Sequence, residues 1–216
     1  LKNLLIKIKN MPFFFENIAI IGRSKKFIKF VKNNLNYKSL TIVPWRNIKI
    51  KRHNKKKMNL ILICGYDYES YKYEYNKFYK TNISQPYNLI KNYYKKNTVI
   101  IYINTTSNKM FTLSRYYYAK HKLNQIIIKN FNNVNSIEVP SIVNSGNIDI
   151  FGSCITKILF KVLIFLNLIK WVEFKNLIRK IKNSLQSPNQ INQKKIKGKF
   201  LEIPRNIFLD RILRLL

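Results

Sequence analysis

The sequence predicts an α/β fold with a doubly wound, mostly parallel sheet and a short helical C-terminal extension. Three observations lead to this prediction. Short apolar runs alternate with segments of helical periodicity along the first two-thirds of the chain. Several of these runs end at glycine or proline, as strands commonly do where the chain turns out of a sheet. One run, Met58 to Gly65, is apolar throughout its centre, which is typical of a strand buried on both faces.

The first predicted unit is a strand, a turn and a helix. Residues 17–21 form a short apolar run that Gly22 ends. Apolar side chains then recur at helical intervals over residues 27–35. A second strand is predicted over residues 40–43, where Pro44 stops it. These elements form the start of a Rossmann-like α/β domain.

The central part of the chain continues the alternation after the third strand, Met58 to Gly65. Residues 66–79 are dense in tyrosine, and we expect them to be half-exposed. The remaining predicted elements are a helix over 84–94, a strand over 99–103, a long helix over 116–131, and a strand over 136–139 that Pro140 halts. Strands joined through helices of this length pair in parallel by right-handed crossovers. Ligands of such sheets bind outside the carboxyl ends of the strands, where Gly22, Gly65, residues 105–107 and Tyr116 fall.

The chain divides into two predicted regions. Residues 15–150 form a Rossmann-like domain of the dinucleotide-binding type, and residues 151–216 form a helical, basic C-terminal region. The longest apolar segment, residues 155–171, contains three lysines. It is also shorter than the ~20 apolar residues of a spanning helix. We therefore predict a buried or interfacial helix there and no transmembrane span.

The net charge of the chain is +32, from 41 Lys and Arg against nine Asp and Glu. Such an excess predicts RNA or another acidic partner. The basic runs at residues 49–57 and 175–199 are the candidate contacts. An A/T-rich coding sequence also enriches Lys and Asn, but it explains the scarcity of acids poorly because Asp and Glu have A/T-tolerant codons. No secretory signal is evident, so the expected location is the cytoplasm or an organelle interior.

The cysteines and histidines predict neither a disulfide framework nor a metal centre. Cys64 and Cys154 form no C-x-x-C pair. His53 lies in a basic run and His121 stands between two lysines, without the carboxylate or thiol neighbours that hold a metal. We therefore expect both histidines at the surface.

The run Ser114 to Lys120, S-R-Y-Y-Y-A-K, carries most of the chemical information. Tyr116 and Lys120 are four residues apart, so on a helix they share one face. A cation held near a phenol favours the phenolate and lowers the tyrosine pKa from its usual value of about 10. This is a geometry for acid–base catalysis. The spacing alone is more simply explained as a chance match, because tyrosine and lysine are both abundant in this chain.

Six segments, taken in their order along the chain, strengthen the interpretation of Tyr116 and Lys120 as a catalytic pair. They are Ile20-Ile21-Gly22 before a helix, Leu60 to Gly65, Asn82 with Pro86 and Leu89, Ile100 to Ser107, Ser114 to Lys120, and Ile137 to Val143. In this order they resemble the extended short-chain dehydrogenase/reductase family, which includes NAD-dependent nucleotide-sugar epimerases and dehydratases. The resemblance covers residues 17 to about 145.

The resemblance implies roles for the matching residues. Tyr116 would be the general acid/base, and Lys120 would bind the nicotinamide ribose and lower the tyrosine pKa. Thr105 or Thr106 would hydrogen-bond the reacting oxygen, and Asn82 would support a proton relay. The implied function is an NAD(P)-dependent epimerase, dehydratase or reductase acting on a nucleotide-linked sugar.

The same resemblance places NAD or NADP at the turn after Gly22, against a helix N-terminus. The implied cofactor contacts are Gly22, Arg23, Ser24, Arg46, Cys64, Gly65, Asn82 and Lys120. The chain departs from the three-glycine pattern of the family, because lysines follow Gly22 where glycines would stand. No acid follows the second strand, and Arg46 there favours NADP slightly over NAD.

Three functions stay open at this point. The first is the oxidoreductase or epimerase, with a homo-oligomer as an open alternative to a monomer. The second is a non-catalytic, basic, RNA-associated component, for example of an organellar ribosome. The third is a structural subunit that retains the fold and docks on a partner or membrane surface through residues 155–171.

Overall fold

The computed structural model describes residues 14–22, 24–45, 57–105, 114–139, 141–144, 147–148, 158, 162 and 171–186. Five parallel strands form its central sheet, in the order β2-β1-β3-β4-β5. Their bounds are β1 Phe14–Ile21, β2 Asn36–Val43, β3 Leu60–Ile63, β4 Val99–Thr105 and β5 Val134–Val139. The predicted doubly wound parallel sheet is therefore confirmed. The strand order reverses between β1 and β3, which makes their carboxyl ends the topological switch point.

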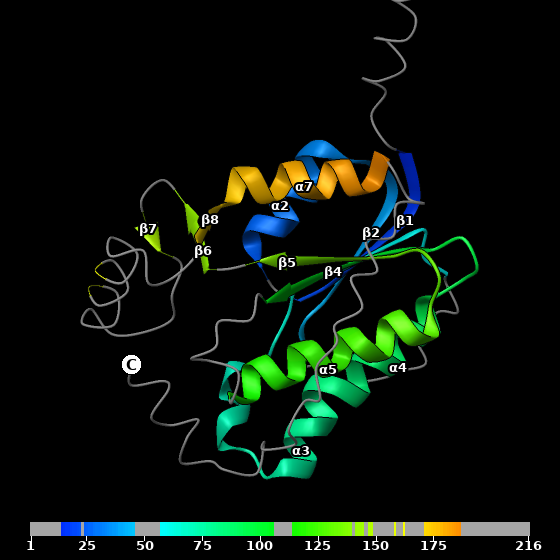
Figure 1. The fold of residues 1–216 in the computed structure, drawn as a ribbon. Coiled ribbons are helices and arrows are strands. Elements are labelled where there is room, and N and C mark those ends of the chain that lie inside the picture. Colours follow the sequence, from blue (N-terminus) through cyan, green and yellow to red (C-terminus); the bar gives the residue numbers. More distant parts are fainter. Residues whose placement is uncertain are drawn as a thin grey trace, which may run out of the picture.

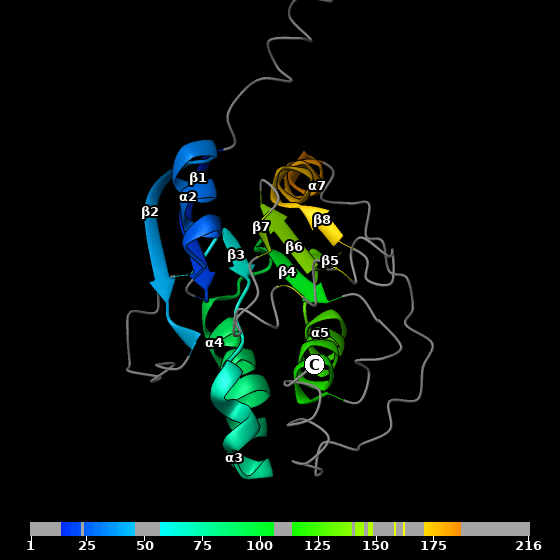
Figure 2. The ribbon, with the colours of Figure 1, turned by 90° about the vertical axis from the view of Figure 1, so that its left-hand side faces the viewer.

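Helices cover both faces of the sheet (Figures 1 and 2). On one face lie α2 (Lys25–Asn34) and α7 (Phe174–Gln186). On the other face the elements are η2 (Tyr68–Lys72), α3 (Tyr75–Tyr79), η3 (Lys80–Ser84), α4 (Gln85–Tyr93) and α5 (Arg115–Asn130). The tyrosine-rich segment predicted to be half-exposed thus folds into short helical turns, and Tyr66 at its start is buried.

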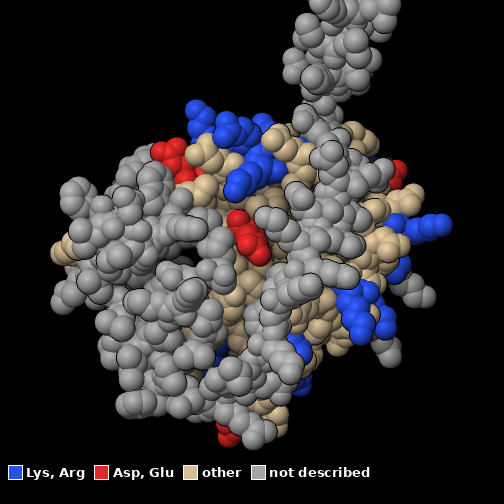
Figure 3. Space-filling model, viewed as in Figure 1, with Lys and Arg blue, Asp and Glu red and all other residues tan. Residues whose placement is uncertain are grey.

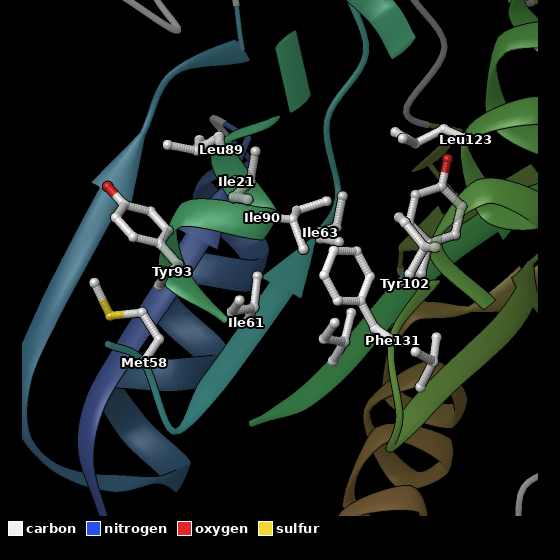
Figure 4. Close-up of a cluster of buried hydrophobic side chains, with 14 of the residues drawn as sticks. Ile21, Met58, Ile61, Ile63, Leu89, Ile90, Tyr93, Tyr102, Leu123 and Phe131 are labelled. Atoms are coloured by element: carbon white, nitrogen blue, oxygen red, sulfur yellow. The ribbon is translucent and has the colours of Figure 1, made fainter. Parts of the chain in front are cut away.

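The core consists of two apolar clusters, one on each side of the sheet. Ala19 and Ile21 of β1 point into the cluster under α4 and α5, whereas Ile18 and Ile20 point into the cluster under α2 and α7. Figure 4 shows the first cluster, in which Ile61 and Ile63 of β3 meet side chains of α4 and α5. All four residues of β3 are buried, as expected of a strand covered on both faces.

The C-terminal part contains strand as well as helix. A small second sheet has the order β7-β6-β8, formed by β6 (Ser141–Asn144), β7 (Asn147–Ile148) and β8 (Trp171–Glu173). Helix α7 follows β8 and buries Leu177, Ile181 and Leu185 in the same cluster as α2. Most of 155–171 and of the basic runs at 49–57 and 175–199 lies outside the described residues. Within the described part, no helix has the length and apolar content needed to cross a bilayer.

Candidate functional site

The loops at the switch point are in direct contact. Gly22 ends β1 with φ +134°, a conformation that favours glycine. A Cβ on Gly22 would lie 2.8 Å from the backbone nitrogen of Gly65 and 3.0 Å from Cys64 Sγ. The Cys64 N–H donates to the Ile21 carbonyl at 3.0 Å, which holds the two loops together. Glycine at position 22 is therefore required by the packing of this chain, independently of any ligand.

Trp45, directly after β2, lies on the Gly65 backbone. A Cβ built on Gly65 would overlap the indole atom Cε3 and would lie 2.8 Å from Cδ2. Trp45 is only 5% exposed, and its Nε1 donates a hydrogen bond of 3.1 Å to Asn82 Oδ1. The indole thus packs directly on the Gly65 backbone, on the side where a Cβ would stand.

Asn82 is fully engaged in holding this arrangement. Besides Trp45, its Oδ1 accepts from the backbone N–H of Asp67 at 3.0 Å. Its Nδ2 donates to the Phe78 carbonyl at 3.3 Å. The amide therefore connects the loop after β2, the loop after β3 and η3. The proton-relay role implied by the resemblance stays a prediction.

Lys120 is buried beneath the carboxyl end of β4. Its Nζ donates to the Ile103 carbonyl at 2.8 Å and lies 5.1 Å from the centre of the Tyr102 ring. Burial lowers the pKa of Lys120 from 10.5 to about 8, opposed by the nearby Cys64 thiol, and burial raises the pKa of that thiol to about 12. The ammonium is thus held by the strand itself.

Tyr116 stands one helical turn before Lys120, in a group of tyrosines. Its ring packs edge-on against Tyr66 at 4.8 Å between centres and stacks on Tyr68 at 5.8 Å. Burial raises the pKa of Tyr116 well above its usual value, and the neighbouring phenols of Tyr68, Tyr102 and Tyr66 raise it further. The sequence-based expectation of a lowered pKa is wrong for this arrangement, because the ammonium of Lys120 is turned to the Ile103 carbonyl.

His121 is buried, contrary to the expected surface position. Its exposed fraction is 2%, its Nε2 lies 3.0 Å from the Thr105 carbonyl oxygen, and its ring packs on Tyr117 at 4.0 Å. The sequence suggested an exposed position because lysines flank His121, but Lys120 and His121 are both buried on the side of α5 that faces β4. His53 lies outside the described residues.

Asn104 is a site residue that the sequence reasoning missed. It is 2% exposed, and neither polar atom of its amide has a hydrogen-bond partner. A polar residue near the end of an apolar strand was the available signal. Buried amides are normally paired, so an unpaired one near the end of β4 indicates a place for a polar ligand or a water. Thr105 follows it and is half-buried. Thr106, Arg23 and Arg46 lie outside the described residues.

The described residues bring together part of the cofactor contacts that the resemblance implies. Of the implied contacts, Gly22, Cys64 and Gly65 come together at the switch point, with Ser24 nearby at the start of α2. The Gly65 surface is covered by Trp45, however, and Asn82 is engaged. Lys25 and Lys29, which stand in the loop and helix start where the family has glycines, are exposed. Phe27 of α2 is buried in the apolar cluster on this face of the sheet. An approach to the Gly65 backbone from this side is blocked while the indole lies there.

Comparisons with known proteins reveal the fold. No protein-family model matches the chain, and no curated protein does. Among solved structures, a dTDP-4-dehydrorhamnose reductase from Clostridium acetobutylicum matches 80% of this chain and 71% of its own, with a TM-score of 0.53 and 17% identity. The capsular polysaccharide assembling protein CapF from Staphylococcus aureus matches 82% of this chain, with a TM-score of 0.51 and 12% identity. This chain spans about half of CapF, 51% of its length. The predicted Rossmann-like α/β fold is therefore confirmed.

Proposed function

We propose that the chain acts on a nucleotide-linked sugar with the proton chemistry of a reductase or epimerase, and that Tyr116 is its proton donor. One observation carries this proposal. Lys120 of α5 donates to the Ile103 carbonyl of β4, and Tyr116, one turn before it, packs on Tyr66 and Tyr68 after β3, in a fold shared with a sugar-nucleotide reductase. The buried, unpaired Asn104 amide near the end of β4 is consistent with a polar ligand group binding there.

The raised pKa of Tyr116 decides the direction of proton transfer. At neutral pH the phenol is protonated, so it can give a proton to the oxygen of a carbonyl group but does not serve as a base. Positive charge on Lys120, one turn away, would stabilise the phenolate left behind only if the ammonium turned from the Ile103 carbonyl towards Tyr116. The Thr105 hydroxyl would donate a second hydrogen bond to the same oxygen. A bound nicotinamide cofactor would supply the hydride in such a reduction.

Residue contacts for the cofactor follow from the same proposal. Lys120 would hold the nicotinamide ribose, and the backbone around Gly22, Ser24 and Gly65 would approach the phosphates. Arg46 would favour NADP slightly over NAD. Close approach to the Gly65 backbone would require that Trp45 first moves off it.

A second candidate function is favoured by Trp45 itself. The indole packs on Gly65 and donates a hydrogen bond to Asn82, so one of the chain's own side chains covers the Gly65 backbone at the switch point. A protein with this feature can keep the fold as a scaffold without turning over a dinucleotide. The second candidate is therefore a non-catalytic component that retains the reductase fold.

Cofactor titration separates the two candidates. NADPH and NADH are titrated into the wild type and into Trp45→Ala, and binding is followed by nicotinamide fluorescence and by the melting temperature. The first candidate predicts saturable binding that stabilises the protein by about 2.7 kcal/mol at 100 times Kd. Flat titrations with both proteins would exclude it and leave the scaffold.

Activity is then tested on a nucleotide-linked keto sugar with the bound cofactor. Tyr116→Phe should lower kcat by about 10²- to 10⁴-fold, because the proton donor is removed. Tyr117→Phe is the matched control, since its ring packs on His121 instead. Equal activity of Tyr116→Phe and the wild type would refute the assignment of Tyr116.

A further inference from the structure

Helices α2 and α7 form one continuous surface, although their sequences lie far apart. Figures 1 and 2 show them on the same side of the sheet. Phe27 of α2 contacts Phe174 of α7 with ring centres 5.4 Å apart. Lys26 Nζ reaches across to the same ring, 5.8 Å from its centre. The two helices are therefore fixed side by side, and their outward faces make a single surface, here called the α2–α7 surface.

The α2–α7 surface is strongly basic and carries no acid within either helix. Its basic residues are Lys25, Lys26, Lys29 and Lys32 of α2, and Lys175, Arg179, Lys180 and Lys182 of α7. Six of these eight are exposed, and the other two are half-buried. Figure 3 shows blue side chains gathered over the part of the molecule where the two helices lie. In the described part of the chain, no ion pair neutralises Lys29, Lys32 or Arg179.

Codon bias does not account for this concentration. A bias towards Lys codons acts on every helix alike, yet α2 has four lysines in ten residues and α4 has one in nine. Among the described acids, Asp67, Glu69 and Glu74 lie in the layer on the opposite face of the sheet, whereas Glu173 directly precedes α7. The charge is thus distributed unevenly between the two helical layers, as a binding face for a polyanion requires.

The apolar residues of the two helices identify the class of polyanion. All of them are buried or half-buried against the sheet, so the surface offers nothing to insert into a lipid bilayer. It also presents no exposed aromatic ring on which single-stranded bases could stack. What remains is a rigid array of cations, suited to the regular phosphates of a double helix.

We propose that the α2–α7 surface binds the phosphate backbone of a nucleic-acid duplex. Lys25 to Lys32 extend over roughly 10 Å of α2, and Lys175 to Lys182 over a similar length of α7. The helices meet at Phe27 and Phe174, so their six exposed cations form neighbouring groups that several phosphates can contact together. This binding does not depend on the proposed reductase chemistry, because the site lies on α2 and α7 and not at α5.

The test is the salt dependence of binding to a 20-base-pair RNA duplex and to the DNA duplex of the same sequence, measured by fluorescence anisotropy. If six cations contact phosphates, log K falls with log [salt] at a slope of about −5, close to −0.9 for each contact on a duplex. Affinity then drops about 10³-fold between 50 and 200 mM salt. The RNA and DNA arms show which duplex geometry fits better.

Matched triple variants locate the site. Lys25→Gln, Lys29→Gln and Lys32→Gln together should reduce the slope by about 3. The control replaces Lys80, Lys91 and Lys129, three exposed lysines of the opposite layer, and removes the same charge. It should leave the slope unchanged. Equal losses in the two triples would overturn the proposal, as would absence of duplex binding at 50 mM salt or binding to anionic vesicles in its place.

Discussion

Replacing Lys120 by Met should change the pH dependence of stability in a defined direction. In the folded protein the pKa of Lys120 is lowered to about 8, against 10.5 for an exposed lysine. Below pH 8 the ammonium is charged in both states, and its burial costs about 3 kcal/mol at ~1.36 kcal/mol per pKa unit. Between pH 8 and 10.5 the unfolded chain holds the proton and the folded protein does not. The cost is therefore relieved as pH rises through this window.

The methionine variant lacks the titrating group but fills a similar volume. Relative to Lys120→Met, the wild type should gain about 2 kcal/mol of unfolding free energy between pH 7 and 9.5. Urea denaturation at several pH values measures this difference, and titration of the remaining groups largely cancels between the two proteins. Lys129→Met, an exposed substitution on the same helix, should give no such gradient. A flat difference for Lys120→Met, or one of opposite sign, would show that the ammonium is not buried at the end of β4.

Three further predictions concern the same region. Gly65→Ala should destabilise the protein by about 1–3 kcal/mol through overlap with the Trp45 indole, and by less in a Trp45→Ala background. A double-mutant cycle by urea denaturation measures this coupling, and additive effects would contradict the contact. Asn82→Leu should cost more than about 2 kcal/mol, because the Trp45 Nε1–H and the Asp67 N–H lose their acceptor, whereas exposed Asn88→Leu should stay within about 0.5 kcal/mol in the same assay. Burial lowers the pKa of His121 from 6.5 to about 4, so stability should fall by about 3 kcal/mol from pH 7 to 4, and His121→Gln should lose that part of the acid dependence.

Local periodicity was sufficient to predict the central sheet and the helices α2, α4 and α5. The strand Met58 to Gly65 is recognisable because burial on both faces removes every polar residue from its centre, and β3 lies within it. The helix predicted over residues 116–131 matches α5, Arg115–Asn130, within one residue at each end. The strands β1 and β5 begin earlier than predicted, since Glu16 and Asn17 interrupt the apolar run of β1 and Asn135 separates Val134 from the rest of β5.

The arrangement of the candidate site could not be predicted in the same way. The spacing of Tyr116 and Lys120 places them on one side of α5, but it does not show that the ammonium finds a closer partner in the Ile103 carbonyl. Contacts of Trp45 with Gly65 and Asn82 join three segments that are separate in sequence. Such contacts depend on how the chain folds back at the edge of the sheet, and periodicity carries no information on that.

The place of α7 in the chain has a consequence for synthesis on the ribosome. Ile137 and Val139 of β5 are covered by α7, whose last residue, Gln186, follows Val139 by 47 residues. At translation rates of ~5–20 residues per second, these apolar residues wait about 2 to 10 s for their cover. A nascent chain that stalls in this interval presents an uncapped sheet face to chaperones and to other nascent chains. Completion of α7, and not of the sheet alone, therefore covers this face of the sheet.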